Sequence, residues 1–168
     1  MVTSFNTASG GFTLLEEGSF IVNLVDKRGI TNRDPISYSL EILPDNNPMI
    51  NVITPAPIIE LGNEQVVPIH LDIMDDFGFT NLQLAYEIKK PDYIKDDSFV
   101  AMFKINKLET DSLIQSIKML WELNNLLLMP DDEVHFHFEL TDNDNISGPK
   151  KTISNTFIQR HTSQCDRL

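Results

Sequence analysis

The chain has 168 residues, of which 41% are hydrophobic and 23% charged, and its formal net charge at pH 7 is −12. These proportions are ordinary for a soluble globular protein of one or two domains. The negative charge argues against nucleic acid as a partner and would oppose adsorption to an anionic membrane. It is compatible with cation binding or with solubility alone.

No apolar run reaches the roughly 18 residues that a membrane-spanning helix needs, so we expect no direct membrane insertion by this fragment. The first residues show no basic region followed by an apolar stretch, and thus no visible signal peptide. If the intact protein is exported, its export signal is absent from this sequence. The single cysteine, Cys165, can form no internal disulfide and leaves the redox compartment open.

Part of residues 1–44 matches the end of the following domain, at a constant offset of 116 residues from Phe20 to Ile30 and, after a one-residue gap, at Ile36-Ser37 with Ile153-Ser154. Phe20, Val22, Leu24, Asp26 and Ile30 align with Phe136, Phe138, Leu140, Asp142 and Ile146. We therefore expect this segment to hold only the C-terminal strands of a truncated β-sandwich domain. Such a piece is marginal in water, so it should pack poorly or pair with the second domain. Its strand edges could also recruit a second chain, which predicts a domain-swapped dimer.

A short linker is predicted at residues 45–48, where Asp45-Asn46-Asn47-Pro48 separates strand-like segments. A complete immunoglobulin-like sandwich is predicted at 49–161, followed by a polar tail at 162–168.

Apolar residues alternate with polar ones through most of residues 49–161, the period expected of half-buried strands. The alternating apolar sets are Val67 to Ile73, Leu82 to Ile88, Phe99 to Ile105, Ile117 to Leu123 and Val134 to Leu140. A last strand is predicted from Lys151 to Arg160. A helix between Glu109 and Leu120 is the alternative for one segment, although the odd-numbered apolar set favours a strand. Pro68 predicts an edge strand or a bulge, because proline cannot donate a ladder hydrogen bond.

Many short strands joined by turn-rich links, without strand–helix alternation, predict an all-β fold. We expect an antiparallel immunoglobulin-like or cadherin-like β-sandwich, preceded by the C-terminal strands of a second similar domain.

Several segments resemble the immunoglobulin-like extracytoplasmic domains of large bacterial membrane-anchored proteins of unknown function. They are Asp75 to Phe79, Leu82 to Tyr86, Trp121 to Leu123, Leu126 to Asp132, Thr141 to Asp144 and Gly148 to Lys150. The resemblance covers most of residues 14–160. It implies the fold and a periplasmic or cell-surface location for the parent protein, but no activity and no functional residues. A weaker likeness is to cadherin-type repeats, whose acidic linkers hold calcium.

Calcium is the first candidate ligand, because it needs several carboxylate and carbonyl oxygens that converge. The candidate ligands are Asp45 and Asn47 at the linker, Asp75 and Asp76 in one turn, and Asp142 and Asp144 in another. The structural alternative is that these side chains hydrogen-bond their own turns. His135, His137 and Glu139 share one strand face, where a zinc site and a solvated surface are the two interpretations.

Enzyme activity is not expected. The chain has no nucleophile-elbow or phosphate-loop pattern. Its paired carboxylates, Asp75-Asp76 and Asp131-Asp132, fall in turns where we expect solvent to screen them. Trp121 is predicted to anchor the core rather than to stack on a sugar.

The predicted function is that of a non-enzymatic structural or protein-interaction module in a larger extracytoplasmic bacterial protein. Its partner would be another protein or neighbouring domains of the same parent chain. The alternatives are a calcium-stiffened adhesive repeat and, third, a carbohydrate-binding module. The first two differ in whether the linker acids converge with acids from the turns.

Overall fold

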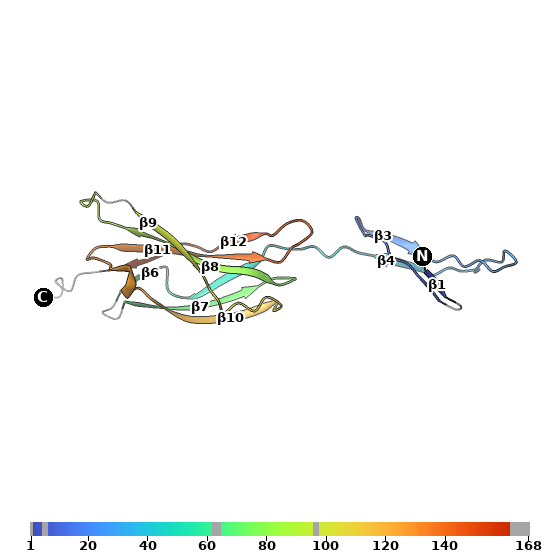
Figure 1. Cartoon of the computed structure of the whole chain (residues 1–168), viewed down its shortest axis with the longest axis horizontal. Helices are drawn as coiled ribbons and strands as arrows, with labels where there is room; N and C mark the ends of the chain where they lie inside the picture. Colours follow the sequence, from blue (N-terminus) through green and yellow to red (C-terminus); the bar gives the residue numbers. More distant parts are fainter. Residues whose placement is uncertain (1, 5–6, 62–64, 96–97, 162–168) are drawn as a thin grey trace. The chain divides into compact units, whose positions relative to one another are not determined.

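The computed structural model describes residues 2–4, 7–61, 65–95 and 98–161, so the polar tail predicted at 162–168 lies outside the described residues. The chain divides into two compact units, Met1–Pro44 and Asp45–Leu168 (Figure 1). We call them unit 1 and unit 2. The division falls where the sequence predicts the linker. No helix in the described ranges is long and apolar enough to cross a membrane.

Unit 2 consists of short strands joined by turns and one 3-10 turn, η1 (Asn124–Leu126). The strands are β5 (Met49–Thr54), β6 (Ile58–Glu60), β7 (Val66–Met74), β8 (Phe79–Lys89), β9 (Phe99–Lys104), β10 (Ile114–Glu122), β11 (Glu133–Asp142), β12 (Lys151–Ile153) and β13 (Phe157–Arg160). The segment for which a helix was the alternative forms strand β10.

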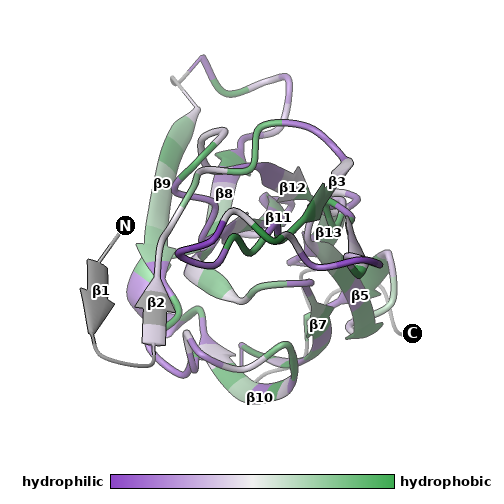
Figure 2. Ribbon diagram, turned by 90° about the vertical axis from the view of Figure 1, so that its right-hand side faces the viewer, coloured by the Kyte–Doolittle hydropathy of each residue, from purple (hydrophilic) through white to green (hydrophobic). Residues whose placement is uncertain are grey.

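The strands of unit 2 form two sheets that face each other. One has the order β10-β7-β5, and the other the order β6-β13-β11-β8-β9, with β12 also paired to β11. Every pairing is antiparallel except that of β6 with β13. Seen end-on, β7 and β10 lie below β8 and β11 (Figure 2). The all-β sandwich prediction is confirmed.

The core follows directly from the period-two alternation, because successive side chains of a strand point to opposite faces. The inward residues of β11 are all fully buried, namely Val134, Phe136, Phe138 and Leu140. The inward residues of β7 oppose them from the other sheet and are buried as well. Trp121 on β10 is also buried and contacts the rings of Tyr86, Phe103 and Phe136, as predicted for a core anchor.

Two features of unit 2 differ from the sequence prediction. The single strand predicted from Lys151 to Arg160 is divided into β12 and β13. Ser154 marks the break: its N–H donates to the Phe138 carbonyl, and its Oγ accepts the Phe138 N–H, both at 2.9 Å. A side chain thus replaces one ladder hydrogen bond there. β5 is the strand-like segment expected after the linker, whereas the short strand β6 was not predicted.

Pro68 lies in β7, the central strand of its sheet, rather than in an edge strand. On one side it pairs with Leu120 of β10. On the other side the pairing with β5 ends at His70, opposite Thr54, after an irregularity in β5. The β5 ladder therefore stops before it reaches Pro68. No partner strand on that side needs an N–H from Pro68, so a proline is tolerated in this central strand.

Unit 1 contains two separate hairpins, β1 (Val2–Ser4) with β2 (Thr7–Ser9), and β3 (Gly18–Ile21) with β4 (Ser37–Leu40). None of the side chains described between residues 7 and 44 is buried. Thirteen large apolar residues there, from Phe12 to Leu43, are exposed. The expectation of a poorly packed segment is confirmed for these described residues.

Gln159 supplies a test of the core. Its side chain is fully buried, and neither amide atom has a hydrogen-bond partner. An unpaired buried polar group costs about 1–3 kcal/mol, so Gln159→Met should raise the free energy of unfolding by about 1–2 kcal/mol in urea titrations. Gln115→Met is the control, because that amide bonds Glu109 and Lys107 and its loss should destabilise. A loss of stability in Gln159→Met would contradict the assignment.

Candidate functional site at the linker end of the sandwich

Three acidic segments meet at one end of unit 2. They are the linker at Asp45-Asn46, the β7–β8 turn around Asp75-Asp76, and the β11–β12 loop that begins at Asp142. They meet because β5 starts, β7 ends and β11 ends at the same edge, as the pairing of Met49 with Met74 shows for the first two. Linker acids and turn acids thus converge. Such convergence is the feature named above to distinguish a calcium-stiffened repeat from a plain structural or interaction module.

Lys150 lies at the centre of this cluster. Its Nζ donates to Asp45 Oδ2 at 2.6 Å and to Asp144 Oδ2 at 3.1 Å, and lies 3.6 Å from Asp142 Oδ2. The hydrogen bond with Asp45 is the main cause that raises the pKa of Lys150 above its ordinary value. An ammonium group thus occupies the middle of three carboxylates, and we call this set the Lys150 cluster.

The acids of the β11–β12 loop also hold their own turn. Asp142 Oδ1 accepts the N–H groups of Asp144 and Lys150, at 3.2 and 2.8 Å. Asp144 Oδ1 accepts those of Ile146 and Ser147, at 2.7 and 3.0 Å. The bond from the Ser147 backbone is the largest cause that lowers the pKa of Asp144, followed by Ile146 and Lys150. The prediction that turn acids bond their own backbone is confirmed here.

In the β7–β8 turn, Asp75 is buried and its Oδ2 accepts the N–H groups of Phe77 and Gly78, at 3.0 and 2.9 Å. Gly78 has φ +112°, and an added Cβ would lie 2.6 Å from the Thr110 carbonyl oxygen. Only glycine fits this position without strain. Asn143 Nδ2 donates to the Phe77 carbonyl at 2.7 Å, which ties this turn to the β11–β12 loop.

Asp76 fastens the linker from the other side. Its Oδ2 accepts both the backbone N–H of Asn46, at 3.0 Å, and the Asn46 side-chain amide, at 2.7 Å. The backbone bond is the main cause that lowers the pKa of Asp76. Two successive linker residues, Asp45 and Asn46, are therefore bonded to two different loops of unit 2.

The structure groups the six calcium candidates unequally. Asp45, Asp142 and Asp144 surround Lys150, Asp75 caps its own turn, Asp76 holds Asn46, and Asn47 is exposed. Among these six residues, three buried carboxylate oxygens have no hydrogen-bond partner: Asp45 Oδ1, Asp75 Oδ1 and Asp142 Oδ2. In the described residues, no group of three or more His, Cys, Asp or Glu side chains has the geometry to hold a metal ion.

Sequence analysis missed two residues of the site, Lys150 and Asn46. Lys150 lies after the acidic turn and immediately before β12, and this placement was the available signal. Asn46 and Asn47 are equivalent in sequence, and only the path of the linker distinguishes them.

The histidine face is occupied by pairs within one strand. His135 Nε2 lies 2.8 Å from Glu133 Oε2, and His137 Nε2 lies 3.4 Å from Glu139 Oε1. Each imidazole is thus paired with a carboxylate two residues away on β11, while Phe136 and Phe138 face the core. This arrangement is that of a polar outer face.

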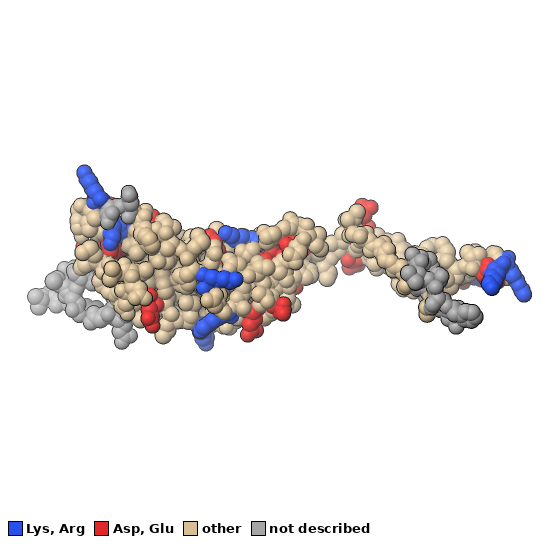
Figure 3. Space-filling model, in the orientation of Figure 1, with Lys and Arg blue, Asp and Glu red and all other residues tan. Residues whose placement is uncertain are grey.

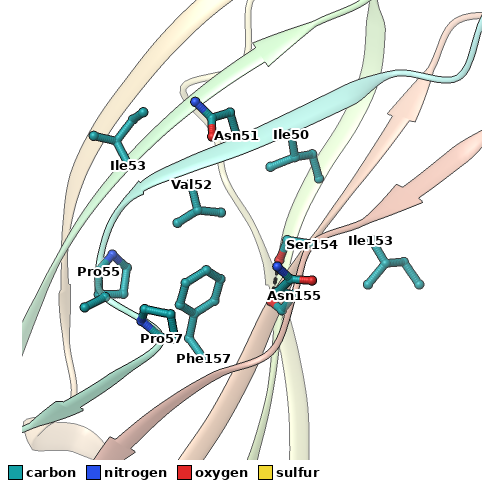
Figure 4. Close-up of a pocket in the computed structure, with 11 residues that line it drawn as sticks. Ile50, Asn51, Val52, Ile53, Pro55, Pro57, Ile153, Ser154, Asn155 and Phe157 are labelled. Atoms are coloured by element: carbon teal, nitrogen blue, oxygen red, sulfur yellow. Dashed lines mark hydrogen bonds between the residues drawn. The ribbon is translucent and has the colours of Figure 1, made fainter.

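A groove of about 410 Å³ lies between β5 and the β12–β13 break. Val52, Pro57 and Phe157 line it, and of these Val52 and Phe157 pack with the core, while Ile50 lies near Ser154 and Asn155 (Figure 4). No titratable side chain is among the described residues that line it, so these residues offer the groove no general acid or base.

The expectation that solvent screens the paired carboxylates is wrong for one member of each pair. Asp75 and Asp132 are buried, whereas Asp76 and Asp131 are exposed. The reason is that each buried carboxylate holds a turn: Asp132 Oδ2 accepts the Met129 N–H at 2.8 Å and the Lys90 ammonium at 2.7 Å.

No protein-family model matches this chain, and no curated protein matches it. The geometry described above is therefore the basis for the functional proposal.

The lowered pKa values of Asp76 and Asp144 predict how the stability of the site depends on pH. A carboxyl whose folded pKa is depressed contributes stability above its unfolded pKa and loses it as pH falls toward the folded value. Lys150→Met should destabilise unit 2 by a constant amount between about pH 6 and 9, and by less below about pH 4. Urea unfolding at a series of pH values measures this difference.

Lys118→Met is the control, because it removes the same charge from an exposed position without an ion pair. Its effect should be small and independent of pH. If the two variants show the same pH profile, the Lys150 cluster does not contribute as described.

Proposed function

We propose that this chain is a non-enzymatic structural or protein-interaction module of a larger extracytoplasmic bacterial protein, in which unit 2 is a rigid spacer with a fixed entry point. The observation that carries the proposal is that Asp45 and Asn46 are bonded to two separate loops of the sandwich. Pro48, which follows them, is buried. The bacterial, membrane-anchored and extracytoplasmic parts of the proposal rest on the sequence resemblance alone.

A spacer must transmit orientation, and the Lys150 cluster supplies the means. Single surface ion pairs add little stability, commonly about 0–1 kcal/mol. A cation shared among several carboxylates still limits the directions in which the chain can leave the domain. On the face of unit 2 that Figure 3 shows, positive and negative side chains are interspersed, and no single-sign patch stands out as a docking surface. This favours a spacer over a charge-steered binding module.

The spacer role predicts a rigid linker in solution. Backbone order parameters of Asp45 and Asn46 should be about 0.85, the value of ordered backbone. In Lys150→Met they should fall toward about 0.6, the value of flexible segments. Nitrogen-15 relaxation measures both, with Lys118→Met as the matched control. Low order parameters in the unmodified chain would overturn the spacer proposal.

A calcium-stiffened adhesive repeat is the second candidate, and one observation favours it. Asp45 Oδ1, Asp75 Oδ1 and Asp142 Oδ2 are buried oxygens without a hydrogen-bond partner, which is a chemistry that calcium accepts. Against it, Lys150 Nζ already lies among three of the candidate carboxylates. Trp121 is buried, so a carbohydrate-binding module would need a different aromatic side chain on which a sugar ring could stack.

Thermal unfolding separates the two candidates. Because Lys150 Nζ already occupies the space among the three carboxylates, melting curves in calcium, magnesium and chelator should superimpose. A site that binds only the native state raises Tm as the ligand exceeds its Kd. A calcium-specific rise of several degrees, abolished by Asp45→Asn, would favour the adhesive repeat over the spacer.

A further inference from the structure

The β3–β4 hairpin of unit 1 shares a stacked aromatic cross-strand pair with strands β11 and β13 of unit 2. In β3–β4, Phe20 pairs with Tyr38, and in β11–β13, Phe136 pairs with Phe157. Both aromatic pairs are stacked, with ring centroids 5.0 Å and 5.5 Å apart. The offset of 116 residues aligns Phe20 with Phe136, whereas Tyr38 and Phe157 are 119 residues apart, so only the first strand of each pair keeps the sequence offset.

The turns that follow the two strands also correspond. Asp26 Oδ1 accepts the N–H of Arg28 at 2.7 Å, just as Asp142 Oδ1 accepts that of Asp144 at 3.2 Å. An aspartate at the end of the strand thus bonds the backbone two residues later in both units. The sequence of the strand, the stacked aromatic pair and the aspartate turn assign β3 the place that β11 has in unit 2.

The two hairpins differ in what surrounds them. Phe136 and Phe157 are 0% and 5% exposed, whereas Phe20 and Tyr38 are 37% and 46% exposed. β11 has antiparallel neighbours on both sides, β8 on one and β12 with β13 on the other. β3 has β4 alone among the described strands. The position equivalent to that of β8 is therefore unfilled in the described part of unit 1.

The backbone next to β3 shows which edge is open. Asn32 accepts the Leu24 N–H and donates to the Val22 carbonyl, both at 2.9 Å, on the hairpin side. Successive residues of an extended chain direct their amide groups to opposite sides. The backbone groups of Ile21, Asn23 and Val25 therefore point away from the hairpin, toward the side that corresponds to β8.

This edge lacks the features that usually prevent strand pairing. Native edge strands carry charges, proline or bulges, but residues 18–25 include no charged residue and no proline. Unit 1 as a whole carries five acidic and three basic residues, a net charge of −2, against −12 for the chain. On the face shown in Figure 3, the charges of unit 1 gather near its ends, and the described atoms between them are uncharged.

We propose that β3 is a self-association edge, which pairs antiparallel with β3 of a second copy of this chain. A two-fold axis makes identical strands antiparallel, which is the direction of the β8 strand that fills the equivalent edge of β11. The sheet of the dimer has the order β4-β3-β3-β4, and the four rings of Phe20 and Tyr38 lie in it. This inference concerns unit 1 and does not depend on the proposed function of unit 2.

A second copy fits this edge better than a charged peptide does. The edge presents backbone groups and apolar side chains. It has no charged side chain that would favour a peptide of opposite charge. Unit 1 carries only −2 of the net charge of −12. Two copies of the chain therefore repel each other less through their first units than through their second units. An identical edge is also present on every copy at the same concentration.

Sedimentation velocity of the full chain over a wide range of concentration tests the proposal. We expect a monomer–dimer equilibrium. Asn23→Lys places a charge beside the open edge while keeping the hairpin hydrogen bonds of Val22 and Leu24, and a two-fold dimer carries this charge twice along the paired strands. Since opposed like charges destabilise strand pairs and each substitution acts twice, Kd should rise roughly tenfold. Asn125→Lys adds the same charge on an exposed turn of unit 2 and should leave Kd unchanged.

Hydrogen exchange gives a second readout that is independent of the variants. The amides of Ile21, Asn23 and Val25 should gain protection as concentration rises, while those of Val22 and Leu24 change little. A monomer at every concentration overturns the proposal. So does a dimer that Asn23→Lys and Asn125→Lys affect equally, or an open-ended series of oligomers, because two-fold pairing of one edge is closed.

Discussion

The contact between Phe136 and Trp121 joins the two sheets of unit 2, and the arrangement of the linker end depends on it. The ring centroids lie 5.1 Å apart, and Phe136 belongs to the six-stranded sheet while Trp121 belongs to the three-stranded one. Since a shift of one residue would turn every apolar side chain to the outer face, burial of these rings determines the strand register. The register in turn brings the start of β5 and the ends of β7 and β11 to one edge. The Lys150 cluster is therefore a consequence of core packing rather than an independent centre of stability.

The cluster contributes geometry more than free energy. Lys150 keeps part of its surface in solvent, so its attraction to Asp45 and Asp144 is screened. A divalent cation would fix the same chain segment only where the ion is present. A lysine of the chain itself fixes it at every calcium concentration. That difference separates a spacer from a calcium-stiffened repeat, although both use an acidic linker opposite acidic turns.

Sequence reasoning succeeded where the physical cause is local and periodic. The alternation from Val134 to Leu140 predicted a strand with a buried face, because period two needs no knowledge of the partner strand. It failed where the cause is the course of the chain. The division of the last strand depends on Ser154 bonding Phe138, sixteen residues away, and the β5 ladder that ends before Pro68 depends on an irregularity in β5. For the site, the acids were identified, but which of them meet depends on three loops at once. Lys150 was overlooked because the sequence was read for oxygen ligands of a metal ion, and not for a lysine whose ammonium group could take the place of that ion.

Unit 1 separates the local from the nonlocal determinants of this fold. The β3–β4 hairpin has a stacked aromatic pair and an aspartate turn like those of β11 and β13, and none of the side chains described around it is buried. These features thus come from the hairpin sequence itself. Burial of Phe136 and Phe157 requires the facing sheet and the neighbouring strand β8 as well. A pattern of alternating apolar residues therefore predicts a strand with one face to cover, and it does not say which polypeptide covers it. In unit 2 the same chain supplies both layers, whereas in the described part of unit 1 the rings of Phe20 and Tyr38 remain 37% and 46% exposed.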